Sequence, residues 1–450
     1  MLTEKYLSMN VSKFSLSDKL HALLKHAPSL SSLELQAATG KSQASISLGL
    51  KQLGAQVVKL GAARSTRYAL TQDILGLPAS HELLWNGPDL LGDVSQRFGS
   101  LTYLQNDGLY VQLGHHVWQT QGRLPWFLTP LKPQGFLGRE LARVRPDFPN
   151  DPDDWTFEQV LYMAINHVND PVGTFFIGVS ETSNFAATND TLQKAEHYEH
   201  LATTIGAGLP AGSSAAGEQP KFTARQRNGE CFIVKFSPPR GTPFGVRWHQ
   251  LLHLEMRALQ ALQANGIACA ETAIVKTAKR TCLESRRFDR GEGATMRHIV
   301  SAAAVHDEFI RTLRVNWVVT CEALVKQQLL SGSDARNVVM SYLFGQFIGN
   351  SDMHFGNLSF FVDDVIKPIF VPTPIYDMLP MMWRPDIHSG NLDPSPLREP
   401  VLPIGYSAEV ALARTWAIDY WQQASSDAEI NAELRALCAE NARRLQHGFD

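Results

Sequence analysis

The chain has 450 residues, of which 44% are hydrophobic and 19% are charged, a composition typical of globular proteins and not of disordered ones. This length predicts two to four domains, and no apolar run approaches the ~18 residues of a membrane span. The five cysteines are scattered and form no C-x-x-C pair, so they indicate neither a disulfide framework nor a zinc site. We therefore expect a cytoplasmic protein without membrane contact.

Charge is distributed unevenly along the chain. The first 70 residues contain nine Lys or Arg and three acidic residues, a net charge of +6, whereas the whole chain carries −3. The remainder is therefore acidic. This asymmetry predicts a basic module attached to an acidic body.

Residues 1–75 have the pattern of a winged helix-turn-helix. Leucines recur at helical spacing in LSDKLHALLK (16–25), and two further helices are predicted before and after Gly40. Two short β-prone runs follow in residues 55–71. Because such a unit places its second helix in the major groove, we expect DNA contacts from Lys41, Ser42, Gln43, Ser45, Arg64 and Arg67. The alternative is a module used only for dimerisation or regulation.

Residues 76–200 predict a β-rich subdomain. LTYLQNDGLYVQLG (101–114) contains two alternating runs around Asn106-Asp107-Gly108, which is a hairpin signal. A surface loop rich in Pro and Asp follows at 146–155. Nothing in this segment predicts catalysis.

Residues 201–295 contain candidate phosphate-binding groups. The Gly/Ser-rich stretch at 208–222 can bring backbone N–H groups close to phosphates. Lys235 lies within the apolar strand ECFIVKFSP, where an ammonium needs an anionic partner. Glu255 shares a helical stripe with Leu251 and Leu259, so its carboxylate points inward. Protein kinases use such a lysine and glutamate at the ATP phosphates; the alternative is a structural buried ion pair.

Residues 296–450 contain the most unusual stretch, FIGNSDMHFGNLSFF (347–361). Asp352 and Asn357 have the D-x-x-x-x-N spacing of a kinase catalytic loop, and Asp377 follows twenty residues later in the apolar PIYDMLP. In a kinase the first Asp accepts the substrate hydroxyl proton, while the Asn and the second Asp bind Mg²⁺. The pieces occur in kinase order along the chain: loop, lysine, glutamate, D-x-x-x-x-N and aspartate.

The motifs SSAAGEQPKF, IVKF, RRFDR and GNSDMHFGNLSFF…YDMLP resemble the HipA-like serine/threonine kinases of bacterial toxin–antitoxin systems, in particular the YjjJ-like subgroup, over roughly residues 95–440. The resemblance implies an α+β multidomain protein. Its winged helix-turn-helix would precede a two-lobed body with a β-rich N-lobe (201–295, after the 76–200 subdomain) and an all-α C-lobe (296–450). It further implies ATP and Mg²⁺ as cofactors, a protein substrate such as an aminoacyl-tRNA synthetase, an antitoxin, and a homodimer.

The resemblance assigns roles to individual residues. Asp352 would be the catalytic base, Asn357 and Asp377 the Mg²⁺ ligands, and Ser214 (with its neighbour Ser213) the site of inhibitory autophosphorylation. The implied ATP-binding residues are Lys235, Glu255, Ser214, Ala215, Ala216, Gly217, His354 and the hinge around Arg286 and Phe288.

Several positions need separate comment. The chain departs from the family pattern at Gly356, where a lysine is common, at Arg286, where a glutamate is common, and at Pro220 in the loop. For His354 we favour a hydrogen-bonding role in the loop over metal ligation. We interpret His115, His116 and His253 as surface or satisfied residues.

Two other function classes remain open. The same Mg²⁺ site, with the basic module delivering DNA, could cleave phosphodiesters. A third reading is a transcription regulator whose degenerate kinase body only senses nucleotide.

Overall fold

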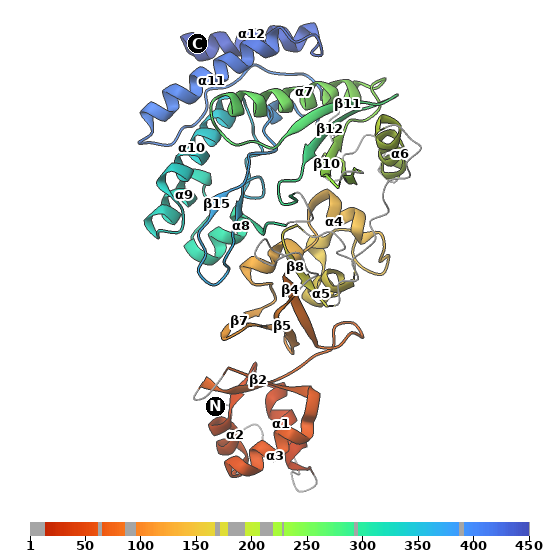
Figure 1. Ribbon diagram of the computed structural model, residues 1–450, viewed down its shortest axis with the longest axis vertical. Helices are drawn as coiled ribbons and strands as arrows, with labels where there is room; N and C mark the ends of the chain where they lie inside the picture. Colours follow the sequence, from red (N-terminus) through yellow and green to blue (C-terminus); the bar gives the residue numbers. More distant parts are fainter. Residues whose placement is uncertain are drawn as a thin grey trace.

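The computed structural model describes residues 14–61, 65–85, 96–166, 172–178, 194–207, 219–226, 229–291, 296–386 and 391–449. Figure 1 shows the N-terminal module at one end of the long axis, a β-sheet region above it, and the C-terminal helices at the opposite end. In the described ranges no helix is both long and apolar enough to cross a membrane.

The N-terminal module contains three helices and a small antiparallel sheet in the order β1-β3-β2. Its elements are α1 (Leu16–Lys25), β1 (Leu30–Ser31), α2 (Ser32–Thr39), α3 (Gln43–Leu53), β2 (Val57–Leu60) and β3 (Arg67–Leu70). Ser15 and Ser31 begin α1 and α2 with capping boxes, and Gly40 ends α2 in the left-handed region at φ 67°. The predicted helix break at Gly40 is therefore confirmed.

The next layer is a five-stranded antiparallel sheet in the order β7-β6-β5-β4-β8. It comprises β4 (Ser80–Trp85), β5 (Gln96–Leu104), β6 (Gly108–Leu113), β7 (His116–Gln121) and β8 (Phe175–Ile177), with α4 (Gly135–Ala142) and α5 (Phe157–Asn166) nearby. Asn106 and Asp107 both adopt φ 58° in the turn between β5 and β6, which confirms the predicted hairpin. Its core is not self-contained, because Phe127 and Phe175 share one apolar cluster with Val300, Phe360 and Phe370.

A second antiparallel sheet has the order β11-β12-β10-β9. Its strands are β9 (Lys221–Arg225), β10 (Cys231–Phe236), β11 (Thr272–Lys276) and β12 (Thr281–Arg286); α6 (Lys194–Ala207) and α7 (Pro243–Ala264) pack against it. Side chains alternate along β10: Phe232, Val234 and Phe236 join the cluster that packs on α6. Lys235 therefore points the other way, toward α7.

The C-terminal part is largely helical but not all-α. Its helices are α8 (Ala302–Val305), α9 (Trp317–Lys326), α10 (Gly332–Phe347), α11 (Ser407–Ser425) and α12 (Ala432–His447). The expectation of an all-α lobe is wrong, because β13 (Ile299–Ser301), β14 (Ser359–Phe361) and β15 (Val371–Pro372) form an antiparallel sheet. The apolar residues after the D-x-x-x-x-N motif satisfy their backbone groups by strand pairing and bury their side chains in the shared core.

A small apolar contact joins the N-terminal module to the five-stranded sheet. Leu60 and Ala69 pack with Leu104 and Tyr110, and the Gly61 N–H donates to the Tyr110 hydroxyl at 3.2 Å. The module thus packs against the hairpin that β5 and β6 form.

Candidate active site

A buried ion triplet lies at the centre of the candidate site. Lys235 on β10 contacts Glu255 Oε1 of α7 and Asp377 Oδ1, each at 2.5 Å from Nζ. The Lys235 and Glu255 side chains are only 7% and 1% exposed. The sequence prediction of an inward glutamate and an anionic partner for the strand lysine is confirmed.

The triplet shifts the pKa of each of its members. Burial alone would lower the pKa of Lys235, but the charges of Asp377 and Glu255 outweigh it and raise that pKa. Burial alone would raise the pKa of Asp377, but Lys235 and Lys221 lower it to about 2. Burial raises the pKa of Glu255 against the opposing effect of Lys235. With both acids ionised, the triplet carries a net charge of −1, which favours the binding of a further cation.

Lys221 on β9 is a site residue that the sequence analysis missed. It pairs directly with Lys235 across the β9–β10 ladder and lines the same pocket as Lys235 and Asp377. A two-residue turn at Asn228-Gly229 would have placed Lys221 opposite Phe236, so the sequence alone did not predict that the two lysines face each other. Like charges opposite one another destabilise a ladder, so this pair indicates an anionic partner.

The D-x-x-x-x-N motif forms a compact loop after α10. The Asn357 side-chain amide donates to the Asp352 carbonyl at 2.8 Å, and the Asn357 N–H donates to the His354 carbonyl at 3.1 Å. Asn350 supports this loop from behind: its Oδ1 accepts from the Asp352 N–H at 3.1 Å and its Nδ2 donates to the Asp377 carbonyl at 3.3 Å. Asn350 thus ties the two halves of the site together.

Asp377 occupies an unusual backbone conformation. Its φ is 54°, a region that costs an L-residue energy and persists only where surrounding contacts hold it. The side chain of the preceding Tyr376 is anchored, since its hydroxyl donates to the Gly356 carbonyl at 2.9 Å and lies 2.7 Å from Ser359 Oγ. The conformation turns the carboxylate toward Lys235.

His354 orients the loop, as the sequence interpretation favoured. Its Nδ1 accepts from the Gly356 N–H at 2.9 Å, and its carbonyl accepts from the Trp317 indole at 3.1 Å. A Cβ at position 356 would lie 2.8 Å from His354 Cε1. The absence of a side chain at Gly356 therefore leaves space for this ring.

These residues surround a pocket of about 280 Å³. Its described lining includes the predicted Lys235, Asp352, His354, Asn357 and Asp377. It also includes Gln134–Leu137, at the start of α4. The 76–200 segment has no catalytic signal in its sequence, but long-range packing brings the start of α4 to the pocket.

The second pocket next to the loop has a volume of about 430 Å³. It is lined by Val315, Asn316, Tyr342, Gln346 and Asn350 together with residues 351–354. Asp352 and His354 line both pockets. Asp352 thus lies where ligands in the two pockets would meet.

The predicted hinge residues lie elsewhere. Arg286 ends β12 and pairs with Glu230 and Glu271 at 3.2 and 3.3 Å, while Phe288 packs at 5.8 Å from the ring of Tyr376. Neither is among the described residues that line the 280 Å³ pocket, nor is Glu255. Ser213, Ser214, Ala215, Ala216 and Gly217 lie outside the described residues, as does Arg64.

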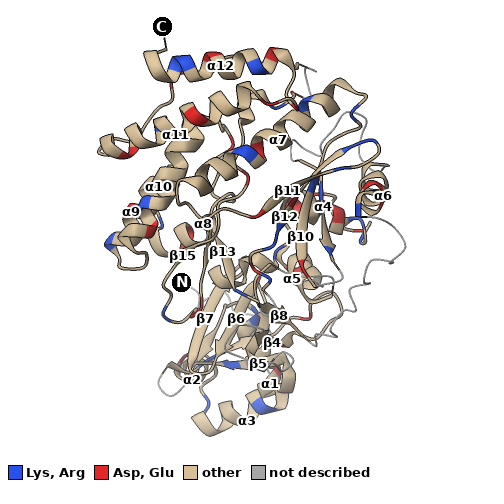
Figure 2. Ribbon diagram, turned by 45° about the horizontal axis from the view of Figure 1, so that its top comes forward, with Lys and Arg blue, Asp and Glu red and all other residues tan. Residues whose placement is uncertain are grey.

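The predicted DNA-contacting residues of the N-terminal module differ in their surroundings. Lys41, Ser42 and Gln43 are exposed at the start of α3, where the Ser42 hydroxyl accepts from the Ser45 N–H as the helix cap. α3 contains no acidic residue (Figure 2). Arg67 has partners inside the module instead: it donates to Ser29 Oγ and the Ser29 carbonyl at 2.8 Å each and lies 3.1 Å from Glu34.

The donor set of the pocket fits a nucleotide with Mg²⁺. Lys221 and Lys235 offer ammonium groups to phosphates, and Asp377, Asn357 and Asp352 offer the oxygen ligands that Mg²⁺ prefers. The two lysines that face each other across the strands would bind an anion, and the carboxylates would bind a cation beside it.

Comparison with known proteins gives a consistent result. The HipA-like C-terminal domain matches residues 213–447, and the YjjJ-like toxin middle domain matches residues 90–186. The chain is 33% identical over 410 residues to Toxin YjjJ of Escherichia coli (strain K12), covering 87% of this chain and 89% of the relative. A solved structure of HipA of Shewanella oneidensis MR-1, in complex with HipB and operator DNA, matches with a TM-score of 0.50 and 17% identity over 81% of this chain and 95% of that one.

Proposed function

Because this chain belongs to the HipA-like family and carries the middle domain of the YjjJ-like toxins, we propose that it is the toxin of a toxin–antitoxin system. We further propose that it acts as an ATP- and Mg²⁺-dependent protein serine/threonine kinase. The observation that carries this proposal is the pairing of Lys221 with Lys235 beside Asp377, in one pocket with Asp352 and Asn357.

Phosphoryl transfer requires bound phosphates, a held cation and an oriented hydroxyl. Lys221 and Lys235 would bind the phosphates of ATP, and Glu255 would hold Lys235 in place. Asp377 and Asn357 would ligate Mg²⁺, which neutralises charge on the phosphates. The Asn357 side-chain N–H already donates to the Asp352 carbonyl, so its Oδ1 is the atom that would face the ion.

Asp352 would act as the base. It is half-buried and lines both pockets, so a hydroxyl entering from the 430 Å³ pocket reaches its carboxylate. That pocket would receive a serine or threonine of the target protein. The family resemblance adds Ser214, with Ser213, as an autophosphorylation site.

For the N-terminal module we propose a winged helix-turn-helix that binds DNA. Its support is the helix pair α2–α3, the three-stranded sheet and the exposed basic start of α3. Gln43 and Ser45 would contact DNA from α3, and Lys41 from just before it; Arg64 would contact DNA from the sequence between β2 and β3. Arg67 would have to exchange its contacts with Ser29 and Glu34 for a phosphate, so we assign it to holding the module together. The related HipA structure contains operator DNA and HipB, which supports DNA and an antitoxin as partners here.

The test of the kinase uses the purified full chain with Mg²⁺ and γ-labelled ATP. Label is followed on the protein itself and on a cell lysate, with plasmid present in the same tube. Asp352→Asn and Asp377→Asn should each lower transfer by about 100-fold or more. Asp363→Asn, which changes an exposed aspartate, is the matched control and should be unaffected.

The outcomes separate the function classes. Label that depends on Asp352 supports the kinase. ATP binding without label and with intact plasmid would instead favour a nucleotide-sensing regulator, and nicked plasmid without label would favour a nuclease. Undiminished label in both aspartate variants contradicts the assignment of the site.

A further inference from the structure

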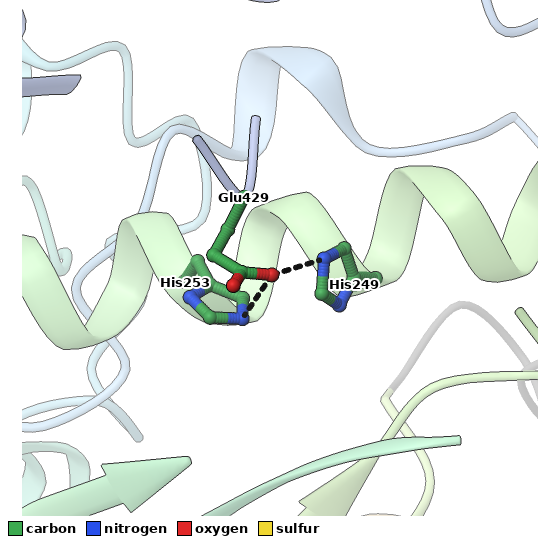
Figure 3. Close-up of side chains that lie close together, drawn as sticks. All are labelled: His249, His253 and Glu429. Atoms are coloured by element: carbon green, nitrogen blue, oxygen red, sulfur yellow. Dashed lines mark ion pairs between the residues drawn. The ribbon is translucent and has the colours of Figure 1, made fainter. Parts of the chain in front are cut away.

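Three potential metal ligands converge outside the candidate active-site pocket (Figure 3). His249 and His253 lie one turn apart on α7, and Glu429 reaches them from the connection between α11 and α12. One ligand atom from each residue lies within 4.8 Å of the others. None of the three is among the described lining residues of the 280 Å³ pocket.

The separation of Glu429 from His249 is that of two metal co-ligands and not of a hydrogen bond. Glu429 Oε2 lies 3.4 Å from His249 Nε2 and 3.8 Å from His253 Nε2, beyond the usual hydrogen-bond range of about 2.7–3.2 Å. Ligands held about 2.0–2.1 Å from a tetrahedral ion are separated by roughly 3.3–3.4 Å. The Glu429–His249 distance already matches this value, whereas His253 would have to move closer to Glu429 to bind such an ion.

Neighbouring groups fix which atoms face the centre. The Thr281 hydroxyl lies 2.7 Å from His249 Nδ1, which leaves Nε2 directed at Glu429. Lys276 Nζ donates to Glu429 Oε1 at 2.6 Å, which leaves Oε2 directed at the two imidazoles. Hydrogen bonding of the outer atom of a ligand is the usual support of a metal site.

His253 supplies an independent observation. It is 6% exposed, and its Nε2 has no hydrogen-bond partner among the described residues. The sequence interpretation of His253 as surface or satisfied is therefore wrong. A buried ring nitrogen without a partner is destabilising unless something binds it.

We propose that His249, His253 and Glu429 bind a divalent transition-metal ion, with Zn²⁺ as the best fit. Two imidazoles and one carboxylate are a common ligand set for this class of ion, and a water would complete a tetrahedron. The other charged groups close to the cluster are Lys276, Arg240 and Asp427, and Asp427 is itself paired with Arg257.

The ion would fasten α7 to the C-terminal helix pair. α7 also carries Glu255, two residues beyond His253 and the partner of Lys235. Arg257 on the same helix pairs with Asp427, two residues before Glu429. The metal would thus add a second tie between the helix that positions the active-site lysine and the connection between α11 and α12.

The experiment measures Zn²⁺ binding to the full chain after chelator treatment, by native mass spectrometry and by competition with a chromophoric chelator. We expect one ion per chain. His249→Gln and Glu429→Gln should weaken binding by about 100-fold or more, and Thr281→Val, which removes only the supporting hydroxyl, by about 10–100-fold. The Glu429 side chain is 37% exposed, so its substitution is compatible with folding.

The matched control is His115→Gln with His116→Gln, which removes two adjacent exposed histidines and should leave the affinity unchanged. Added Zn²⁺ should raise the Tm of the wild type but not of Glu429→Gln, and Co²⁺ should give the visible absorption of a tetrahedral site. Absence of a bound ion in the wild type, or equal affinity in the wild type and Glu429→Gln, would overturn the proposal.

Discussion

Replacement of Lys235 by methionine tests whether one ammonium stabilises the buried triplet. The variant keeps the apolar stem but removes the group that contacts Glu255 and Asp377 at 2.5 Å each. Glu255 is 1% exposed, so its carboxylate would lose a counter-ion without gaining water. Removal of one partner of a buried pair costs about 3–5 kcal/mol of unfolding free energy. For the body of residues 76–450, with an unfolding entropy of about 2.1 cal/mol/K per residue, that corresponds to a fall in Tm of roughly 4–6 °C, measured by differential scanning calorimetry.

A second substitution in the same chain is the control. Lys235→Met with Glu255→Leu removes the stranded carboxylate, and an apolar pair in place of a buried ion pair is neutral or stabilising. The double variant should therefore regain most of the lost Tm while phosphotransfer stays as low as in the single variant.

The pH dependence of the single variant gives a further check. When the pKa of an acid is higher in the folded than in the unfolded state, the folded state loses stability as pH rises above the unfolded-state pKa, here 4.5 for Glu255. The loss of unfolding free energy in Lys235→Met, relative to the wild type, should therefore become smaller as pH falls toward 4.5. The reasoning is refuted if Lys235→Met melts with the wild type, or if the double variant is no more stable than the single one.

Four further predictions concern other residues. Lys221→Met should weaken ATP binding about 10–100-fold in calorimetric titration, because one charged phosphate contact is lost. Gly356→Ala should slow phosphotransfer about 5-fold through contact with the His354 ring, and should cause no further loss in a His354→Ala background. Lys41→Ala should lower the slope of log K against log salt concentration for DNA binding, measured by fluorescence anisotropy, by about one. An unchanged slope would show that Lys41, just before α3, does not contact the DNA backbone. Burial lowers the pKa of His298 to about 3 from the ordinary 6.5, so the unfolded chain binds the extra proton and stability falls as pH drops from 6.5 toward 3; His298→Gln should flatten this part of the urea-stability profile.

Residues whose local pattern conflicts with burial were predictable. Lys235 in an apolar strand and Glu255 on an apolar stripe each required a partner, and the structure pairs them. The positions of Asp352 and Asn357 followed from a spacing of five residues within one loop. In these cases the sequence separation is short or the chemical conflict is strong.

Residues brought in by long-range packing were not predictable in the same way. Gln134–Leu137 reach the pocket from a segment without any catalytic signal. The spacing of His249 and His253 was visible, but the third member, Glu429, is 176 residues beyond His253. The contacts of Arg67 with Ser29 and Glu34 were likewise not predicted.

The shared apolar core has a consequence for how the chain folds during synthesis. Phe127 and Phe175 of the five-stranded sheet region pack in one cluster with Phe360 and Phe370, which leave the ribosome much later. At about 5–20 residues per second, the interval between β8 and Phe370 is roughly 10–40 s. Throughout this interval the early sheet lacks part of its apolar cover. The nascent chain is thus a natural client for chaperones, and fragments that stop before β13 should aggregate.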